Sequence, residues 1–155
     1  MNLRTCELDE EVEAGSFRHR EVGVRPRLGG ELIGCSLYEV PPGARLWPYH
    51  WHLNNEEWAI VVSGAPTVRT PEGERELREG DVLAFPEGEA GAHTFTNRTD
   101  EPVRVAIFST LRPGNSFYPD SDKVAAGPPG DRRCYRRSDA VDYWTSEASD
   151  ETAAR

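Results

Sequence analysis

The sequence contains few cysteines and no long apolar segment. The three cysteines lie far apart and include no CxxC pair: Cys6, Cys35 and Cys134. We therefore expect reduced thiols in a cytoplasmic protein rather than a disulfide framework. The longest apolar run, "WAIVV" at residues 58–62, is too short to cross a bilayer, and the acidic N-terminal sequence lacks the apolar segment of a secretory signal. These absences predict a soluble, intracellular protein.

Positive charge is also scarce. The chain has 27 acidic and 18 basic residues, a net charge of −9. Nucleic acids and anionic membranes bind clustered Lys and Arg, so we expect neither of them as a partner. The one dense basic cluster, "DRRCYRR" at residues 131–137, has acidic neighbours and is interpreted as a solvated patch. A small-molecule substrate or ligand is the expected partner.

Helical periodicity is missing between residues 29 and 110. Short β-rich runs alternate there with Gly, Pro, Asn and Asp turns, which is typical of an all-β antiparallel sandwich or barrel. At 155 residues the chain is expected to form one domain. We predict an N-terminal extension (1–28), a barrel (29–112) and an irregular C-terminal extension (113–155). Within the last, "AVDYW" is expected to dock on the barrel and "SEASDETAAR" to be disordered.

Three of the four histidines lie in this β-rich region. Side chains two residues apart share one face of a strand, so His50 and His52 point the same way, and His93 lies on a later strand. Glu57 begins the apolar run after the first pair. If these faces meet inside one barrel, three imidazoles and a carboxylate converge. Burying them costs free energy unless each is paired or ligated, and a divalent transition ion satisfies all four. The fourth histidine, His19, is expected at the surface.

Two stretches resemble the sequence motifs of the cupin superfamily. The first consists of Gly43, His50, His52, Glu57 and Gly64, and the second of Gly80, Pro86, Gly88, His93 and Asn97. The sequence "GDVLAFPEG" is a close fit to the start of the second motif. The loops before His50 and His93 are longer than the family pattern by one and two residues, which changes a turn rather than the facing of the side chains. The resemblance covers residues 40–110, and the C-terminal tail is similar to that of small single-domain cupins named as sugar-phosphate isomerases.

The resemblance implies a small antiparallel jelly-roll barrel. It also implies one divalent transition metal ion (Mn, Fe, Ni or Zn) held by His50, His52, Glu57 and His93. Four protein ligands leave two positions of an octahedral ion open, as in catalytic metal sites. We therefore expect a metal-dependent enzyme of the isomerase or epimerase type, acting on a small oxygenated or carbohydrate-like substrate. A mononuclear iron dioxygenase and a non-catalytic ligand-binding or sensor domain are the two alternatives.

Other side chains near the motifs have weaker expected roles. Four of them could line the mouth of the site: Tyr38, Arg45, Tyr49 and Lys123. Glu56 should face away from the barrel, and Asn97 should serve a turn rather than the metal. The tryptophans are interpreted as sheet-packing and dimer-face residues: Trp47, Trp51 and Trp58. No cluster of arginines is evident for a phosphate group. The β-rich segment 29–40 and the Trp-rich surface favour a homodimer.

Overall fold

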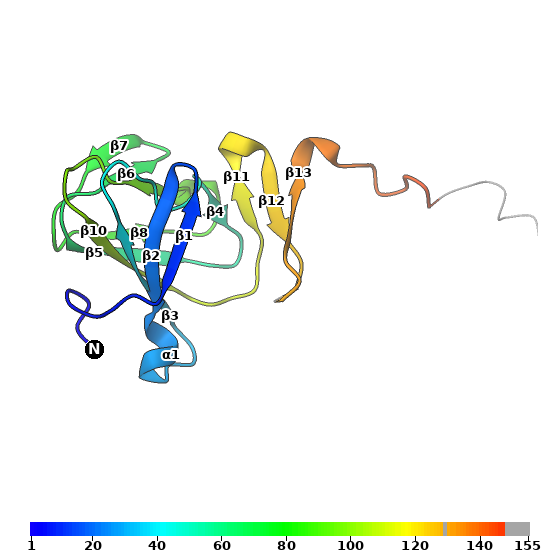
Figure 1. The fold of residues 1–155 in the computed structure, drawn as a ribbon. Helices are drawn as coiled ribbons and strands as arrows, with labels where there is room; N and C mark the ends of the chain where they lie inside the picture. The colour runs from blue at the N-terminus through cyan, green and yellow to red at the C-terminus, as the bar shows by residue number, and fades with distance from the viewer. Residues whose placement is uncertain (129, 148–155) are drawn as a thin grey trace, which may run out of the picture.

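A computed structural model describes residues 1–128 and 130–147 of the chain, which fold into three antiparallel sheets (Figure 1). The largest sheet has the strand order β1-β2-β3-β10-β5-β8. Its strands are β1 (Glu10–Ala14), β2 (Phe17–Gly23), β3 (Gly34–Val40), β10 (Val103–Ser109), β5 (Glu57–Ser63) and β8 (Val82–Phe85). A single turn of helix, α1 (Val24–Leu28), connects β2 to β3.

The three-stranded sheet and the strand of the four-stranded sheet that comes first in the chain form the opposite layer. The three-stranded sheet has the order β7-β6-β9 and the four-stranded sheet the order β13-β12-β11-β4. Their strands are β7 (Gly73–Glu76), β6 (Thr67–Thr70), β9 (Thr94–Thr96), β13 (Arg133–Arg136), β12 (Lys123–Ala126), β11 (Ser116–Tyr118) and β4 (Trp51–His52). The 3-10 helices are η1 (Glu89–Gly91), η2 (Pro119–Ser121) and η3 (Arg137–Asp139). The extended segment before β4 joins the two sheets, since Leu46 N donates to Phe95 O and His93 N donates to His50 O.

The predicted all-β antiparallel fold is therefore confirmed. The two layers enclose one apolar core, and the ladders do not close completely into a barrel. The core side chains come from both layers, on the inward positions of alternating strands. They include Val40, Leu46, Ala59, Val61, Val68, Leu83, Phe85, Phe95, Val103, Val105 and Ile107. This core leaves one end of the roll to polar side chains.

The N-terminal segment is more regular than its apolar pattern indicates. Residues 1–28 contribute β1, β2 and α1 to the large sheet and its outer face. In the β1–β2 ladder, Glu11 lies opposite Arg20 and Glu13 opposite Arg18. Opposite charges facing each other across strands stabilise such a pair, and apolar periodicity does not detect this signal.

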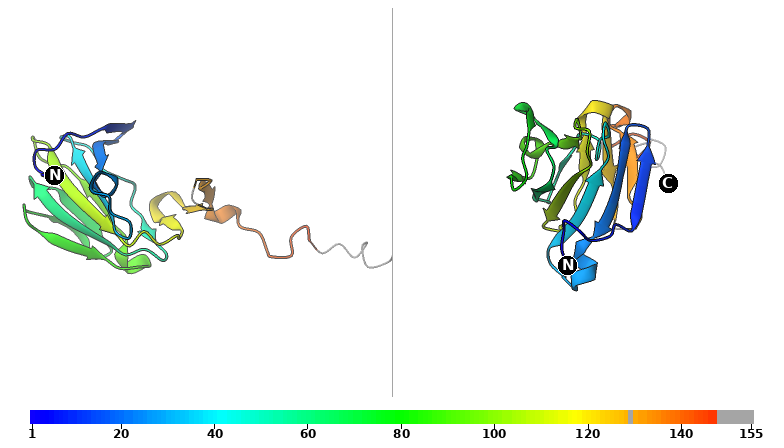
Figure 2. Two further views of the ribbon diagram at one scale, coloured as in Figure 1. Left: turned by 90° about the horizontal axis from the view of Figure 1, so that it is seen from below. Right: turned by 60° about the vertical axis from the view of Figure 1, so that its left-hand side comes forward.

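The C-terminal segment forms β11, β12 and β13, which stand beside the body of the roll (Figures 1 and 2). The expected docking of "AVDYW" is wrong, because the chain runs away from the roll after η3. Val141, Tyr143 and Trp144 are 73%, 81% and 64% exposed. Most of the predicted disordered end, residues 148–155, lies outside the described residues. In the part of the chain that the structure describes, no helix has the length and apolar character needed to cross a membrane.

Asn97 serves a turn, as predicted, and is fully buried. Its Nδ2 donates to Val40 O at 2.9 Å and to Glu101 O at 2.8 Å, and its Oδ1 accepts from Thr99 N at 2.9 Å. The amide thus joins the end of β3 to the turn before β10.

We expect Asn97→Ala to lower the free energy of unfolding by about 2–4 kcal/mol, because each buried polar group left unpaired costs about 1–3 kcal/mol. Urea denaturation of the metal-free protein measures the loss. The control is Arg98→Ala, whose side chain makes only a surface ion pair with Glu74 and should change stability by less than about 0.5 kcal/mol. Equal effects of the two substitutions would contradict this role for Asn97.

Candidate metal centre

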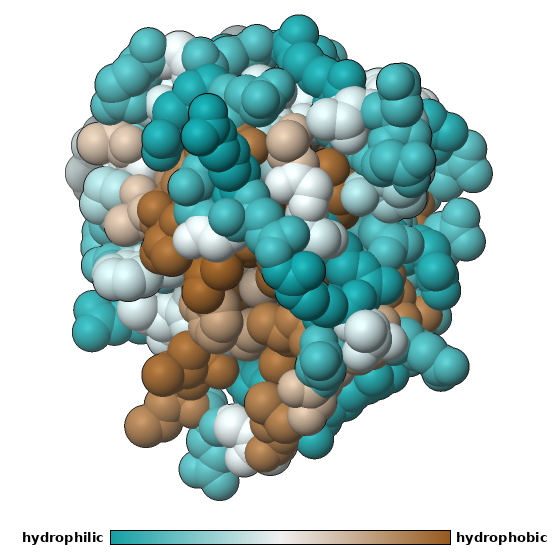
Figure 3. Space-filling model, turned by 90° about the vertical axis from the view of Figure 1, so that its left-hand side faces the viewer, coloured by the Kyte–Doolittle hydropathy of each residue, from teal (hydrophilic) through white to brown (hydrophobic). Residues whose placement is uncertain are grey.

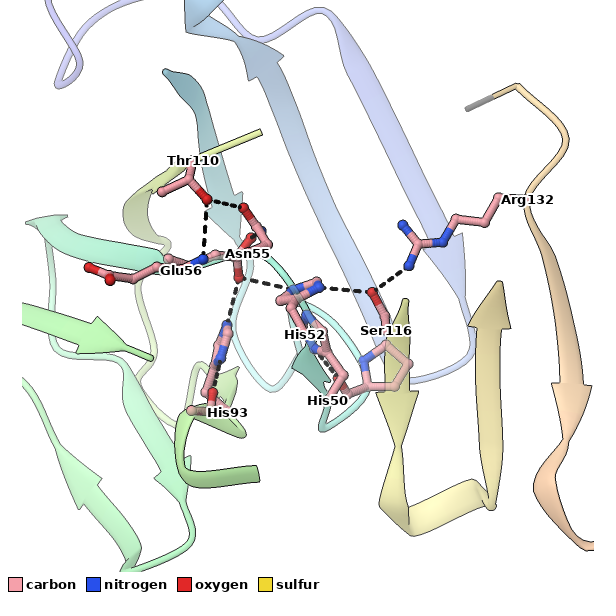
Figure 4. Close-up of polar contacts among 11 residues, drawn as sticks. His50, His52, Asn55, Glu56, His93, Thr110, Ser116 and Arg132 are labelled. Atoms are coloured by element: carbon pink, nitrogen blue, oxygen red, sulfur yellow. Dashed lines mark hydrogen bonds and ion pairs between the residues drawn. The ribbon is translucent and has the colours of Figure 1, made fainter. Parts of the chain in front are cut away.

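His50 and His52 lie on one side of the segment that ends in β4. β4 pairs with β11 in the register Ser116↔His52, which fixes the position of the segment. Trp51, between the two histidines, points to the other side and stacks on Phe117 with ring centroids 4.0 Å apart. The alternation predicted from the sequence is therefore present, and both imidazoles face the polar end of the roll (Figure 4).

Glu57 is the first residue of β5, which lies between β10 and the edge strand β8 of the large sheet, and its side chain is 14% exposed. Asn55 Nδ2 lies within 3.4 Å of Glu57 Oε1. The next acid along the chain, Glu56, points outward as predicted and accepts a hydrogen bond from the Trp58 indole at 2.6 Å. The large sheet therefore contributes one inward carboxylate to the polar end.

His93 faces His50 across the second layer. Two backbone hydrogen bonds of 3.2 and 2.9 Å link the two residues, and His93 is only 2% exposed. Its ring stacks on Phe85 at 3.8 Å. The longer loop before it forms η1, in which a side chain at Gly91 would lie 1.8 Å from Pro86 O. The extra residues are thus absorbed in a compact turn and His93 still faces the site.

Backbone carbonyls fix the tautomer of two of these imidazoles. His50 Nδ1 lies 2.8 Å from Pro48 O, and His93 Nδ1 lies 2.9 Å from Gly91 O. A carbonyl can only accept, so both Nδ1 atoms carry the hydrogen. Each Nε2 is then left with a free lone pair, which is the form of imidazole that ligates a metal ion.

The free nitrogens gather around the carboxylate. His52 Nε2 lies 3.2 Å and His93 Nε2 3.4 Å from Glu57 Oε2, and the His50 and His93 ring centroids are 4.9 Å apart. His50, His52 and Glu57 offer ligand atoms that all lie within 4.8 Å of one another. His52 Nε2 is buried and lacks a partner with hydrogen-bond geometry. This donor set fits a divalent transition metal ion.

Burial and charge shift the pKa values of His50, His93 and Glu57. Burial lowers the pKa of His50 to about 3, helped by repulsion from His93 and His52, and burial also lowers the pKa of His93. Burial opposes ionisation of Glu57, but its interactions with His52 and the other two histidines outweigh burial and hold the pKa of this carboxyl below its ordinary value. At neutral pH the cluster therefore offers the neutral imidazoles of His50 and His93 and one carboxylate.

The cluster opens into a cavity of about 140 Å³. Besides the four polar side chains, the cavity is lined by Tyr38, Trp47, Pro48, Ile107 and Tyr118. Burial raises the pKa of Tyr38 to about 12 and also raises the pKa of Tyr118, so both phenols are neutral at physiological pH. The lining contains no Lys or Arg among the described residues.

The residues expected at the mouth divide into two groups. Tyr38 lines the cavity, as predicted. Arg45, Tyr49 and Lys123 instead line a separate pocket, where the Arg69 guanidinium lies 3.9 Å from the centre of the Tyr49 ring. Those three side chains therefore do not contribute to the lining of the cavity.

Two aromatic positions differ from the sequence-based interpretation. Trp47 lines the cavity rather than serving only sheet packing. His19, expected at the surface, is 1% exposed and packs between Tyr38 and Trp47 at centroid distances of 5.6 and 4.3 Å. Its strand, β2, was not predicted, so its inward direction could not be read from alternation. Tyr118 was missed because β11 lies in a segment interpreted as irregular.

Comparison with known proteins places this geometry in a family. Residues 36–111 match the model of the cupin domain family Cupin_2. The chain belongs to the cupin superfamily, as the motif resemblance predicted. Cupins bind small-molecule ligands, and members of the family usually hold a metal ion. No protein of curated function matches the sequence.

Several solved structures share the fold. A cupin-superfamily sugar phosphate isomerase from Silicibacter pomeroyi is 25% identical with a TM-score of 0.79, covering 90% of this chain and 94% of its own. A protein from Acidithiobacillus ferrooxidans, provisionally named a sugar phosphate isomerase, is 23% identical with a TM-score of 0.75, covering 81% of each chain. Oxalate decarboxylase from Lactobacillus farciminis is 20% identical with a TM-score of 0.54, covering 70% of this chain and 33% of its own.

Proposed function

We propose that the centre binds one divalent transition metal ion through His50, His52, Glu57 and His93. The free Nε2 lone pairs and the single carboxylate support this ligand set. Three nitrogens and one oxygen suit Mn, Fe, Ni or Zn. Glu57 supplies the only negative charge among the four, and the open side of the cluster leads to the cavity.

We expect His52→Ala or His93→Ala to weaken binding of Mn²⁺ or Zn²⁺ by more than about tenfold, since even the partners of metal ligands contribute about 10–100-fold to affinity. Elemental analysis and chelator competition measure the change. His19→Ala is the control, because it removes a buried histidine outside the cluster. Stoichiometric metal in the His93 variant at wild-type affinity would exclude His93 as a ligand.

We propose further that the protein is a metal-dependent isomerase or epimerase acting on a small oxygenated or carbohydrate-like molecule. One observation carries this proposal: the donor cluster faces a small, partly open cavity with two neutral phenols in its wall. The volume of about 140 Å³ is below the roughly 300–1,000 Å³ of drug-sized ligand sites, which suits a molecule of few carbon atoms. The similar structure from Silicibacter pomeroyi bears the name of a sugar phosphate isomerase.

The side chains around the cavity have different roles in such a reaction. A bound divalent ion would polarise a substrate carbonyl as a Lewis acid. Tyr38 and Tyr118 keep their protons at neutral pH and can donate hydrogen bonds to substrate oxygens. Trp47 and Ile107 form apolar wall and exclude water from the carbon skeleton. Since no cationic side chain among the described residues lines the cavity, the substrate is uncharged at this position rather than phosphorylated.

The decisive measurement is proton exchange. The substrate is a short hydroxy-aldehyde or hydroxy-ketone in D₂O. We expect the metal-loaded protein to replace the hydrogen on the hydroxyl-bearing carbon next to the carbonyl with deuterium, without oxygen uptake. NMR measures this exchange. Tyr38→Phe should slow exchange by about 10²–10³-fold, the usual cost of one hydrogen-bond donor at a reacting oxygen. Tyr135→Phe, on the exposed hairpin, is the control. Oxygen consumption would favour the dioxygenase alternative, and binding without exchange the sensor alternative.

We also propose that two copies of the chain pair through the outer face of the large sheet. Apolar side chains gather on this face, with hydrophilic residues around them (Figure 3). Leu32, Ile33 and Trp58 are 83%, 64% and 50% exposed there. These three side chains line a groove on this face, and Glu56 and Arg112 line the same groove. A twofold interface repeats one patch on itself, so an acid and a base within the patch can face each other across the axis.

We expect the wild-type protein to elute in size-exclusion chromatography with light scattering at twice 17.3 kDa, and Ile33→Glu to shift it to the monomer. A buried unpaired charge in an apolar interface costs several kcal/mol. Val141→Glu is the control, since Val141 is 73% exposed and lies outside this face. A wild-type protein that is monomeric at micromolar concentration would refute this pairing.

A further inference from the structure

The C-terminal strands touch the centre at Ser116. This residue begins β11, pairs with His52 in the ladder to β4, and is 4% exposed. Its Oγ lies 2.8 Å from His52 Nδ1. A strand outside the cupin domain match thus supplies the hydrogen-bond partner of one imidazole in the cluster (Figure 4).

Arg132 holds the hydroxyl of Ser116 from the far side. Its Nη2 donates to Ser116 Oγ at 3.0 Å and to Ala125 O at 3.1 Å on β12. The residue is exposed at the end of the loop from β12 to β13, yet these contacts of its guanidinium are partly buried. Among the described residues Arg132 makes no ion pair, whereas its neighbour Arg133 pairs with Asp131. The hydrogen bonds of Arg132 are thus directed into the protein.

His52 differs in this respect from the other two imidazoles. His50 and His93 are held by carbonyls two residues earlier in their own loops. A carbonyl is a fixed acceptor, whereas a serine hydroxyl rotates and can either donate or accept. The orientation and tautomer of His52 therefore depend on what holds Ser116.

We propose that Arg132, acting through Ser116, is a positioning residue for His52, so that the C-terminal strands set the affinity of the metal centre. This inference rests on the proposed metal site. With one lone pair of Ser116 Oγ occupied by Arg132, the other accepts the hydrogen from His52 Nδ1. His52 Nε2 then keeps its lone pair and points at Glu57. Removing either partner leaves the imidazole free to turn or to change tautomer, and such partners are worth about 10–100-fold in metal affinity.

The test compares four variants of the full chain. The dissociation constants of Zn²⁺ and Mn²⁺ are measured separately by chelator competition, and the unfolding temperature of each metal-free protein is recorded. Ser116→Ala should weaken binding by about 10–100-fold, and Arg132→Gln should weaken it in the same direction. Ser116→Thr keeps the hydroxyl and should restore most of the affinity. Arg133→Gln is the matched control, because the Arg133 side chain bonds only to Asp131 within the described part of the chain, and it should bind within about twofold of wild type.

A double substitution separates a relay from two independent effects. If Arg132 acts through Ser116, Ser116→Ala combined with Arg132→Gln binds no more weakly than Ser116→Ala alone. Additive losses overturn the relay. Unchanged affinity in both single variants also overturns it. So does a loss of metal affinity that parallels a fall in the unfolding temperature of the metal-free variants, whether or not residue 116 keeps its hydroxyl. A wild-type protein that binds neither ion overturns the metal centre itself, which is a different result from unchanged variants.

Discussion

Two backbone hydrogen bonds between His50 and His93 hold the polar end of the roll together. They join the segment before β4 to the segment before β9, which lie far apart in sequence. Together with the bond from Leu46 N to Phe95 O, they link the two smaller sheets. The same bridge places two imidazoles side by side and turns them towards Glu57 of the opposite layer. The same backbone contacts therefore serve both the fold and the donor cluster.

The electrostatic design of the centre follows from its burial. The buried rings of His50 and His93 remain neutral more easily than charged, and the lowering of the His50 pKa to about 3 expresses that cost. Glu57 Oε2 lies 3.2 Å from His52 Nε2 and 3.4 Å from His93 Nε2, and the pKa of this carboxyl is held below its ordinary value. A site of this kind is short of positive charge, and a divalent cation supplies that charge without requiring any ring to take up a proton.

The sequence predicts the parts of the structure that local rules govern. Alternation is enough to put His50 and His52 on one face and Trp51 on the other, and the motif resemblance is enough to add His93 and Glu57. The apolar pattern of the sequence does not predict β2, because the stabilising signal there is charge pairing across strands, such as Glu11 with Arg20. Ser116 could not be found either, because it reaches His52 only through the pairing of β11 with β4.

The chemistry of the cavity wall, rather than the names of similar structures, limits the substrate. A phosphate group carries nearly two negative charges and is bound in proteins by Arg, Lys or clustered backbone amides. The wall here offers phenols, an indole and aliphatic carbon, and its one carboxylate repels anions. Arg132 and Lys123 lie near it but face Ser116 and the Tyr118 ring. If a phosphorylated sugar does enter, its phosphate must therefore lie outside the cavity, and only its hydroxyl and carbonyl oxygens reach the centre.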